Sequence, residues 1–169
     1  MIPPLSRLDF FTVVDLRNRL PQLSPTYFPN ARTYALLTCS PTLMTGPTSD
    51  LAKEIHQITR TPALTDPKVL NNTLEWLAVQ SDISRITTDF QYGSGSLMVS
   101  QWNKFNLYGT AFEDQPLLVS TPFTPSSTLD GLVYFLPTRE EGGIQVCMAL
   151  DQDTWVELDT DTDFRRPSD

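Results

Sequence analysis

The apolar residues at the start of this chain have the composition of β-strands. The run 10–14 is rich in β-branched and aromatic residues and predicts a strand within 9–20. That strand should stop before Pro21, because proline cannot donate a hydrogen bond to a strand ladder. Residues 21–30 contain Pro21, Pro25 and Pro29 and predict a loop, and 32–39 predict a second strand.

A helical period replaces the strand pattern after residue 48. Ser49 is the expected N-cap of a helix that Pro62 should end. A second helix is expected over 66–79, with Pro67 in its first turn. The apolar residues with helical spacing in these two segments are Leu51, Ala52, Ile55, Ile58, Val69, Leu70, Leu74 and Leu77.

The pattern returns to short strands after residue 81 and ends in a short helix. The expected elements are a weak strand at 85–88, strands at 97–101, 117–121, 131–137 and 143–150, and a helix at 151–158. The residues Glu140-Glu141-Gly142-Gly143 predict a hairpin turn. Strands, then helices, then strands predict an α+β fold, with a mixed β-sheet and helices on one face, in a single domain over 1–169.

Composition and charge exclude several classes of partner. The net charge is −8, and the 12 basic residues are scattered, so we expect no nucleic-acid partner. No apolar run approaches the ~18 residues that a membrane span needs. The sequence shows no signal peptide at its start, so we expect a soluble cytoplasmic protein without membrane association.

Few residues could carry chemistry. His56 is the one histidine, and it should lie on a helix surface. A metal site would need further histidine or cysteine ligands, which the sequence lacks. We therefore expect no metal and no cofactor. Cys39 and Cys147 are expected to be buried free thiols. Asp89 and Asp130 are candidate acid–base carboxylates, with solvated turn residues as the plainer alternative.

Thirteen residues carry a resemblance to a known family. The segment 100–112, Ser-Gln-Trp-Asn-Lys-Phe-Asn-Leu-Tyr-Gly-Thr-Ala-Phe, resembles the S-x-W-x-x-F-x-x-Y-x-x-D-F-G segment of BAHD-type acyltransferases, including fungal relatives that acylate secondary metabolites. Residues 14–20 resemble the family's V-D-x-R-x-R-L, residues 27–30 its Y-F-G-N, and 131–150 its closing hairpin. The resemblance implies the C-terminal half of a chloramphenicol-acetyltransferase-like fold.

The same segments depart from the family where its chemistry lies. Ala111 and Glu113 replace the aspartate and glycine of the D-F-G box, and no H-x-x-x-D motif is present. The resemblance implies that the catalytic histidine belongs to an N-terminal domain that this sequence does not contain. It also implies that Arg17 has lost its aspartate partner, so we expect Arg17 to pair with Asp9, Glu113 or Asp114, or to lie on a ligand cavity.

The resemblance also suggests where a ligand would bind. Ser100 and Trp102 match positions that line the acceptor pocket in plant members, although ordinary packing would equally explain Trp102. The expected ligand-binding residues are Ser100, Trp102, Tyr108, Asn30, Tyr27 and Arg17.

Two hypotheses follow for function. The first is a half-transferase that binds an apolar small molecule without acyl transfer, with cyclisation or isomerisation in secondary metabolism as candidate reactions. The second is a non-catalytic partner that forms a homodimer, or that complements a separate chain bearing the H-x-x-x-D histidine to make a split acyltransferase.

Overall fold

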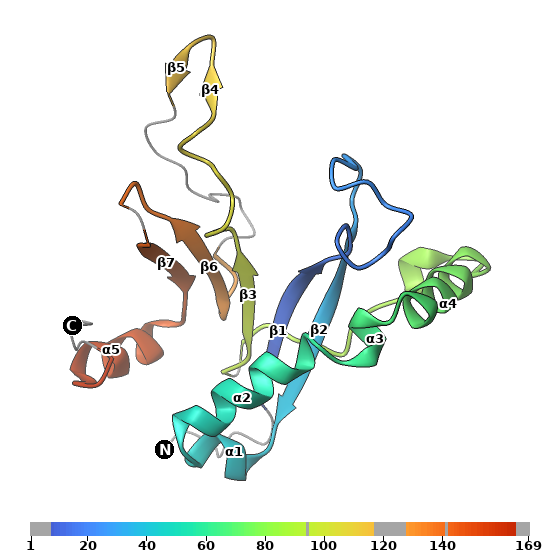
Figure 1. The fold of residues 1–169 in the computed structure, drawn as a ribbon. Coiled ribbons are helices and arrows are strands. Elements are labelled where there is room, and N and C mark those ends of the chain that lie inside the picture. The colour runs from blue at the N-terminus through green and yellow to red at the C-terminus, as the bar shows by residue number, and fades with distance from the viewer. Residues whose placement is uncertain (1–7, 94, 117–127, 141, 165–169) are drawn as a thin grey trace. The chain divides into compact units, whose positions relative to one another are not determined.

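The computed structural model describes residues 8–93, 95–116, 128–140 and 142–164. The chain divides into two compact units, Met1–Gln91 and Tyr92–Asp169. Each unit contains its own strands and helices, as the colours of Figure 1 show.

The first unit is built on an antiparallel hairpin of β1 (Leu8–Asp15) and β2 (Arg32–Cys39), with Leu8 opposite Cys39. Both strands were predicted, and β2 has the predicted bounds. The pairing of the two strands extends one residue beyond β1, where the Leu16 amide donates to the Ala31 carbonyl at 2.9 Å. The chain then turns at once, because the Leu20 amide donates back to the Leu16 carbonyl at 3.0 Å. The segment between the strands contains no helix or strand, as its prolines predicted.

Helices follow the hairpin: α1 (Pro41–Thr45), α2 (Thr48–Ile58), α3 (Pro62–Thr65), α4 (Pro67–Ala78) and the 3₁₀ turn η1 (Ile83–Arg85). Proline opens α1, α3 and α4, where its missing N–H has no helical partner to lose. Ser40 caps α1 by accepting from the Leu43 amide at 3.2 Å, and Asp66 caps α4 by accepting from the Lys68 amide at 2.8 Å.

Three expectations about this region were wrong or incomplete. Helix α2 begins at Thr48 after Pro47, so Ser49 lies inside the first turn and is not the N-cap. The strand expected at 85–88 is absent; a 3₁₀ turn with an Asp82 cap occupies its start. Helices α1 and α3 were missed because five and four residues are too few to show a helical period.

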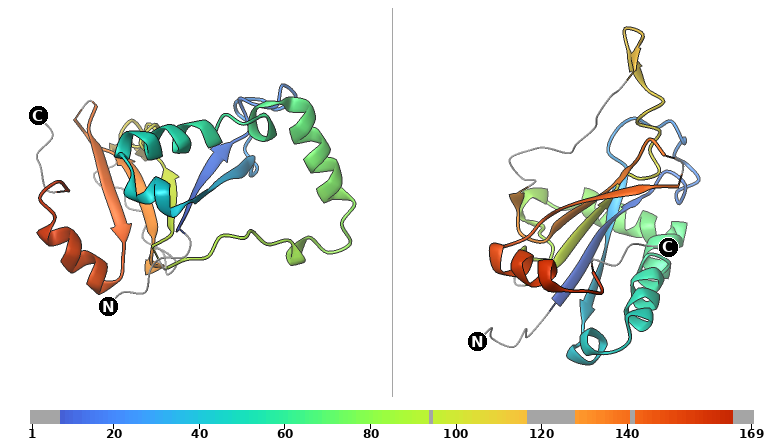
Figure 2. Two further views of the ribbon diagram at one scale, coloured as in Figure 1. Left: turned by 90° about the horizontal axis from the view of Figure 1, so that it is seen from below. Right: turned by 90° about the vertical axis from the view of Figure 1, so that its left-hand side faces the viewer.

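The two faces of the β1–β2 hairpin differ. On one face Val14 and Ala35 pack with Leu64 of α3 and Ile58 of α2, so helices cover this face (Figure 2). On the other face the ring of Phe11 stacks between Tyr34, at 4.8 Å between centroids, and Phe90, at 4.9 Å. Helices α2 and α3 therefore lie against one side of the strands of this unit.

The second unit holds a three-stranded mixed sheet. Strand β3 (Leu97–Gln101) runs parallel to β6 (Leu132–Pro137), and β6 pairs antiparallel with β7 (Ile144–Ala149). Helix α5 (Gln152–Thr160) follows β7, with Asp151 as its cap. These elements were predicted to within two residues, including the turn that joins Pro137 to Ile144.

Gly131 fixes the start of β6. It has φ of 85°, and a Cβ there would lie 2.0 Å from the Ser96 carbonyl oxygen, so no other residue fits.

A small separate hairpin interrupts the second unit. Strands β4 (Ala111–Phe112) and β5 (Gln115–Pro116) pair across Glu113 and Asp114, whose φ values of 48° and 65° form a tight turn. This hairpin contains the altered D-F-G positions and was not predicted. The strand expected at 117–121 lies outside the described residues.

None of the helices in the described part of the chain could span a bilayer, because none combines the necessary length and apolar run.

Candidate functional site

Strand register in the second unit brings three side chains into one row. Ser100 of β3 lies opposite Tyr134 of β6, and Tyr134 lies opposite Cys147 of β7. Residues opposite each other in a sheet point to the same face. Ser100, Tyr134 and Cys147 therefore share one face of the sheet, and each is half-buried.

Trp102 extends this row beyond the end of β3. Its amide donates to the Phe135 carbonyl at 2.8 Å, which fixes its backbone to β6. Its indole Nε1 donates to Ser100 Oγ at 3.0 Å. The predicted pair Ser100 and Trp102 is thus in direct contact, and Trp102 is half-buried, so its ring lies at the margin of the core.

Two further rings complete what we call the aromatic platform, formed by Trp102, Phe105 and Tyr134. Tyr134 meets Trp102 edge-on, with centroids 5.6 Å apart and planes at 79°. The ring centroid of Phe105 lies 6.3 Å from that of Trp102, and Phe105 is 55% exposed. The turn that places it has the Phe105 amide donating to the Trp102 carbonyl at 2.9 Å.

Tyr108 lies further along the same loop. The guanidinium carbon of Arg139, from the turn after β6, lies 5.5 Å from the centroid of the Tyr108 ring. This is cation–π geometry, and it ties the loop to the β6–β7 turn.

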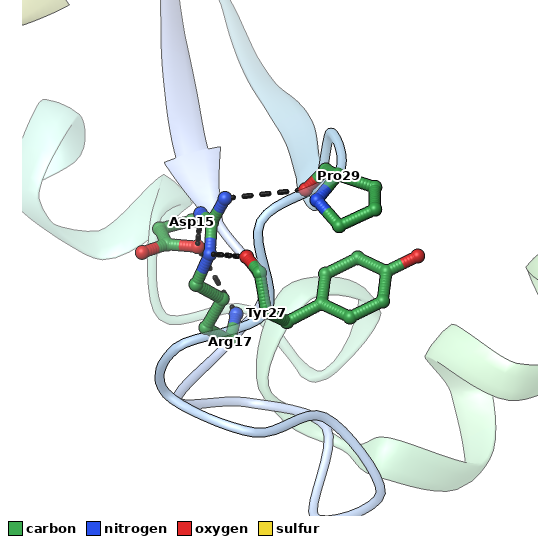
Figure 3. A network of polar contacts seen from close by, with 4 residues as sticks. All are labelled: Asp15, Arg17, Tyr27 and Pro29. Carbon is green, nitrogen blue, oxygen red and sulfur yellow. Dashed lines mark hydrogen bonds and ion pairs between the residues drawn. The ribbon is translucent and has the colours of Figure 1, made fainter.

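Arg17, Tyr27 and Asn30 form a second group, in the first unit. Figure 3 shows Arg17 between Asp15 and the loop that contains Tyr27 and Pro29. Its NH1 forms an ion pair with Asp15 Oδ1 at 2.8 Å, Nε donates to the Tyr27 carbonyl at 2.8 Å, and NH2 donates to the Pro29 carbonyl at 3.3 Å. Tyr27 and Asn30 are exposed.

The partner of Arg17 corrects the expectation from the resemblance. Arg17 pairs with Asp15, two residues before it, and not with Asp9, Glu113 or Asp114. Asp15 is nearer along the chain and is the last residue of β1, so its carboxylate lies beside Arg17 without a long-range contact. The backbone amide of Arg17 also donates to Asp15 Oδ1, at 3.0 Å.

The other candidate groups are placed as structural or surface residues. His56 is exposed on α2, as predicted. Asp130 Oδ1 accepts from the Asp151 amide at 2.9 Å, and Asp89 is exposed. Burial raises the pKa of the Cys39 thiol and the Asp9 carboxylate raises it further, which disfavours the thiolate. Cys147 is also free, but half-buried rather than buried.

Sequence reasoning missed Tyr134 and Cys147. The apolar runs 131–137 and 143–150 predicted the two strands, but only the register shows which of their residues lie in one row with Ser100. Within the described residues no cluster of His, Cys, Asp or Glu is arranged to hold a metal ion. The site can offer aromatic surface and a hydroxyl group to a ligand.

Comparison with known proteins agrees with this architecture. The model of the Transferase family matches residues 3–164. Comparison with curated proteins gives no match. Among solved structures, TRI101 of F. sporotrichioides, complexed with coenzyme A and T-2, has a TM-score of 0.74 at 20% identity and is matched over 94% of this chain and 40% of its own.

Two other solved structures extend the comparison. TRI101 of F. graminearum, complexed with coenzyme A and deoxynivalenol, has a TM-score of 0.72 at 22% identity, over 96% of this chain and 36% of its own. Vinorine synthase has a TM-score of 0.62 at 16% identity, over 89% of this chain and 33% of its own. The predicted fold, half of a BAHD-type and chloramphenicol-acetyltransferase-like architecture, is confirmed. This chain spans well under half the length of these solved chains.

Proposed function

We propose a function from one premise: the chain belongs to the Transferase family. Within that family we infer that it supplies a small-molecule-binding half of the fold. A largely apolar ligand would bind on the aromatic platform, and the chain alone would not transfer an acyl group. Cyclisation or isomerisation of the bound ligand, by shape and hydrogen bonding, is the reaction class that this site would support.

One observation carries the proposal: the Trp102 indole is fixed in orientation but is not enclosed by the core. The Nε1–Ser100 Oγ bond of 3.0 Å and the edge-on Tyr134 ring set its plane. Trp102 is half-buried and its neighbour Phe105 is 55% exposed, so part of this aromatic surface is accessible to a ligand. Oriented, accessible rings are what an apolar ligand needs.

The polar groups suggest how such a ligand would be oriented. Ser100 Oγ accepts from Trp102, and its own hydroxyl proton can still be donated to a ligand oxygen. Tyr108 would add a phenol. Arg17, Tyr27 and Asn30 stay proposed ligand contacts of the first unit, where Tyr27 and Asn30 are exposed and Arg17 already holds the loop.

The test is a binding measurement that reports on Trp102 alone. Trp76 and Trp155 are 53% and 37% exposed, so W76F/W155F should retain the fold and leave Trp102 as the single tryptophan. Titrating that protein with T-2 and with deoxynivalenol, the ligands of TRI101 structures, should quench or shift its fluorescence. Ser100→Ala should weaken binding by roughly fivefold, as expected for one lost hydrogen bond.

Ser49→Ala is the matched control, because Ser49 is exposed on α2 and should leave binding unchanged. No response of Trp102 to either probe, or equal binding by the Ser100→Ala and Ser49→Ala proteins, would contradict the platform as a ligand site. Coenzyme A in the same assay shows whether the response is specific to T-2 and deoxynivalenol.

A further inference from the structure

The loop between β1 and β2 presents a phenylalanine to solvent in an unusual way. Phe28 is 95% exposed, more than any other large apolar residue in the described part of the chain. Exposed apolar side chains are common, but the other exposed large apolar residues in the described part of the chain are 36% to 79% exposed, so part of each is covered. Nearly the whole surface of this ring is left uncovered.

Arg17 fixes the backbone on both sides of Phe28. Its Nε binds the Tyr27 carbonyl at 2.8 Å and its NH2 binds the Pro29 carbonyl at 3.3 Å, so one guanidinium holds the residue before Phe28 and the residue after it (Figure 3). The ion pair to Asp15 fixes the guanidinium in turn. Pro29 adds a restricted φ. The exposed ring therefore stands on a backbone that is already ordered.

An ordered, exposed aromatic ring has the properties of an interface anchor. Aromatic residues, phenylalanine among them, are enriched in protein interfaces, and the residues that dominate binding fill well-packed pockets. Ordering the backbone beforehand reduces the entropy that association must remove. Arginine is well suited to this task, because its planar fork can bind two carbonyls at once.

We propose that Phe28, held outward by Arg17, anchors an interface with the remaining part of the transferase fold. The occupant follows from the comparisons: the chain is matched almost completely, yet it covers only 36% to 40% of the TRI101 chains. The surfaces of this half must therefore meet the part of such a fold that lies outside the match. The inference does not rest on the ligand site, and its test contains no small molecule.

The test uses a chimera in which this chain replaces the matched segment of F. graminearum TRI101. Phe28→Ser is placed in the free chain and in the chimera, and thermal unfolding of both is measured. The free chain should be unaffected, because the ring makes few contacts there. The chimera should lose about 3 °C in Tm, as expected for an anchoring residue in a large protein. Val79→Ser is the control: Val79 is 79% exposed in the same unit and should change neither Tm.

The Arg17→Met variant tests whether the effect of Phe28 depends on the backbone that Arg17 holds. In the chimera, Phe28→Ser should cost much less when Arg17 is already replaced, because the ring is no longer held outward. Equal effects of Phe28→Ser in the free chain and the chimera, an effect no larger than that of Val79→Ser, or a chimera that does not unfold cooperatively would overturn the proposal. So would a free chain that sediments as a dimer and becomes a monomer on Phe28→Ser, since the occupant would then be a second copy.

Discussion

Two arginines near the start of the chain show how single residues set the local structure. Arg17 and Arg19 are two residues apart, and both bind backbone carbonyls. Arg17 holds the loop after β1, while NH1 of Arg19 donates to the carbonyls of Thr59 and Leu64, each at 2.8 Å. Thr59 is the C-cap of α2 and Leu64 lies in α3. A cation at the end of a helix also matches the negative end of its dipole.

This arrangement predicts that Arg19 matters for stability although it touches no candidate site. Arg19→Ala should lower the free energy of unfolding by about 2–3 kcal/mol, because two charge-assisted hydrogen bonds are lost and two carbonyls lose their partner. Urea denaturation would measure this, with Arg32→Ala as the control, since Arg32 is exposed at the start of β2. A loss below that of the control would show that water replaces the guanidinium without cost.

At the scale of elements, prediction from sequence succeeded where a pattern was long and failed where it was short. The strands 32–39 and 97–101 have their predicted bounds, because each run is rich in apolar, aromatic or β-branched residues and lies next to a segment that contains proline or glycine. The helices α1 and α3 and the β4–β5 hairpin are too short to carry a period. Helices α1 and α3 each begin with a proline in the first turn. The β4–β5 hairpin depends on Glu113 and Asp114, which both adopt a positive φ.

The candidate site divides in the same way. Ser100 and Trp102 were predictable because they lie in one short motif and their hydrogen bond is local. Tyr134 and Cys147 were not, since their place beside Ser100 depends on the register of three strands. For Arg17 we predicted an acidic partner from a distant part of the sequence. The structure instead pairs it with Asp15, the last residue of β1, which is only two residues away.

Helix α5 offers a pH test at this scale. Its cap, Asp151, accepts from the Thr154 side chain at 2.6 Å and from the Thr154 amide at 3.0 Å, and these bonds hold the pKa of Asp151 below its usual value of 3.8. A carboxyl group whose pKa is lower in the folded state than in the unfolded state stabilises the fold at every pH above its unfolded-state pKa. That contribution disappears as the pH falls through the lowered value.

We therefore expect the Thr154 amide resonance and the α5 helical shifts to be constant from pH 7 to about 5 and to change below 3.8. Asp151→Asn should retain a cap but remove this transition, and Asp151→Ala should raise hydrogen exchange in the first turn by about fivefold. Asp153→Asn is the control and should leave the transition in place. A wild-type midpoint at or above 3.8 would argue against the cap.

At the scale of the whole molecule, the fold is that of an acyltransferase family, whereas the motif residues of this chain differ from those of the family. The fold is half of an acyltransferase architecture, matched over 33% to 40% of the solved chains. The family's box has Ala111, in strand β4, and Glu113, in the two-residue turn that follows it, at two of its positions. The one histidine is exposed on α2 and has no aspartate four residues later. The aromatic platform remains the proposed binding surface, whereas the sequence contains no H-x-x-x-D motif whose histidine would act as the base for acyl transfer to a hydroxyl.

This contrast predicts no acyl transfer by the chain on its own. Incubation with a panel of acyl-CoAs and alcohols should release free coenzyme A no faster than buffer does, because the one histidine lies on α2 and the sequence has no H-x-x-x-D motif to deprotonate an acceptor hydroxyl. Coenzyme A should be quantified by chromatography, since Cys39 and Cys147 are free thiols and would react with a thiol dye. His56→Ala is the decisive variant. Turnover by the wild-type chain that His56→Ala abolishes would make this exposed histidine a catalytic base, and the half would then be an acyltransferase in its own right.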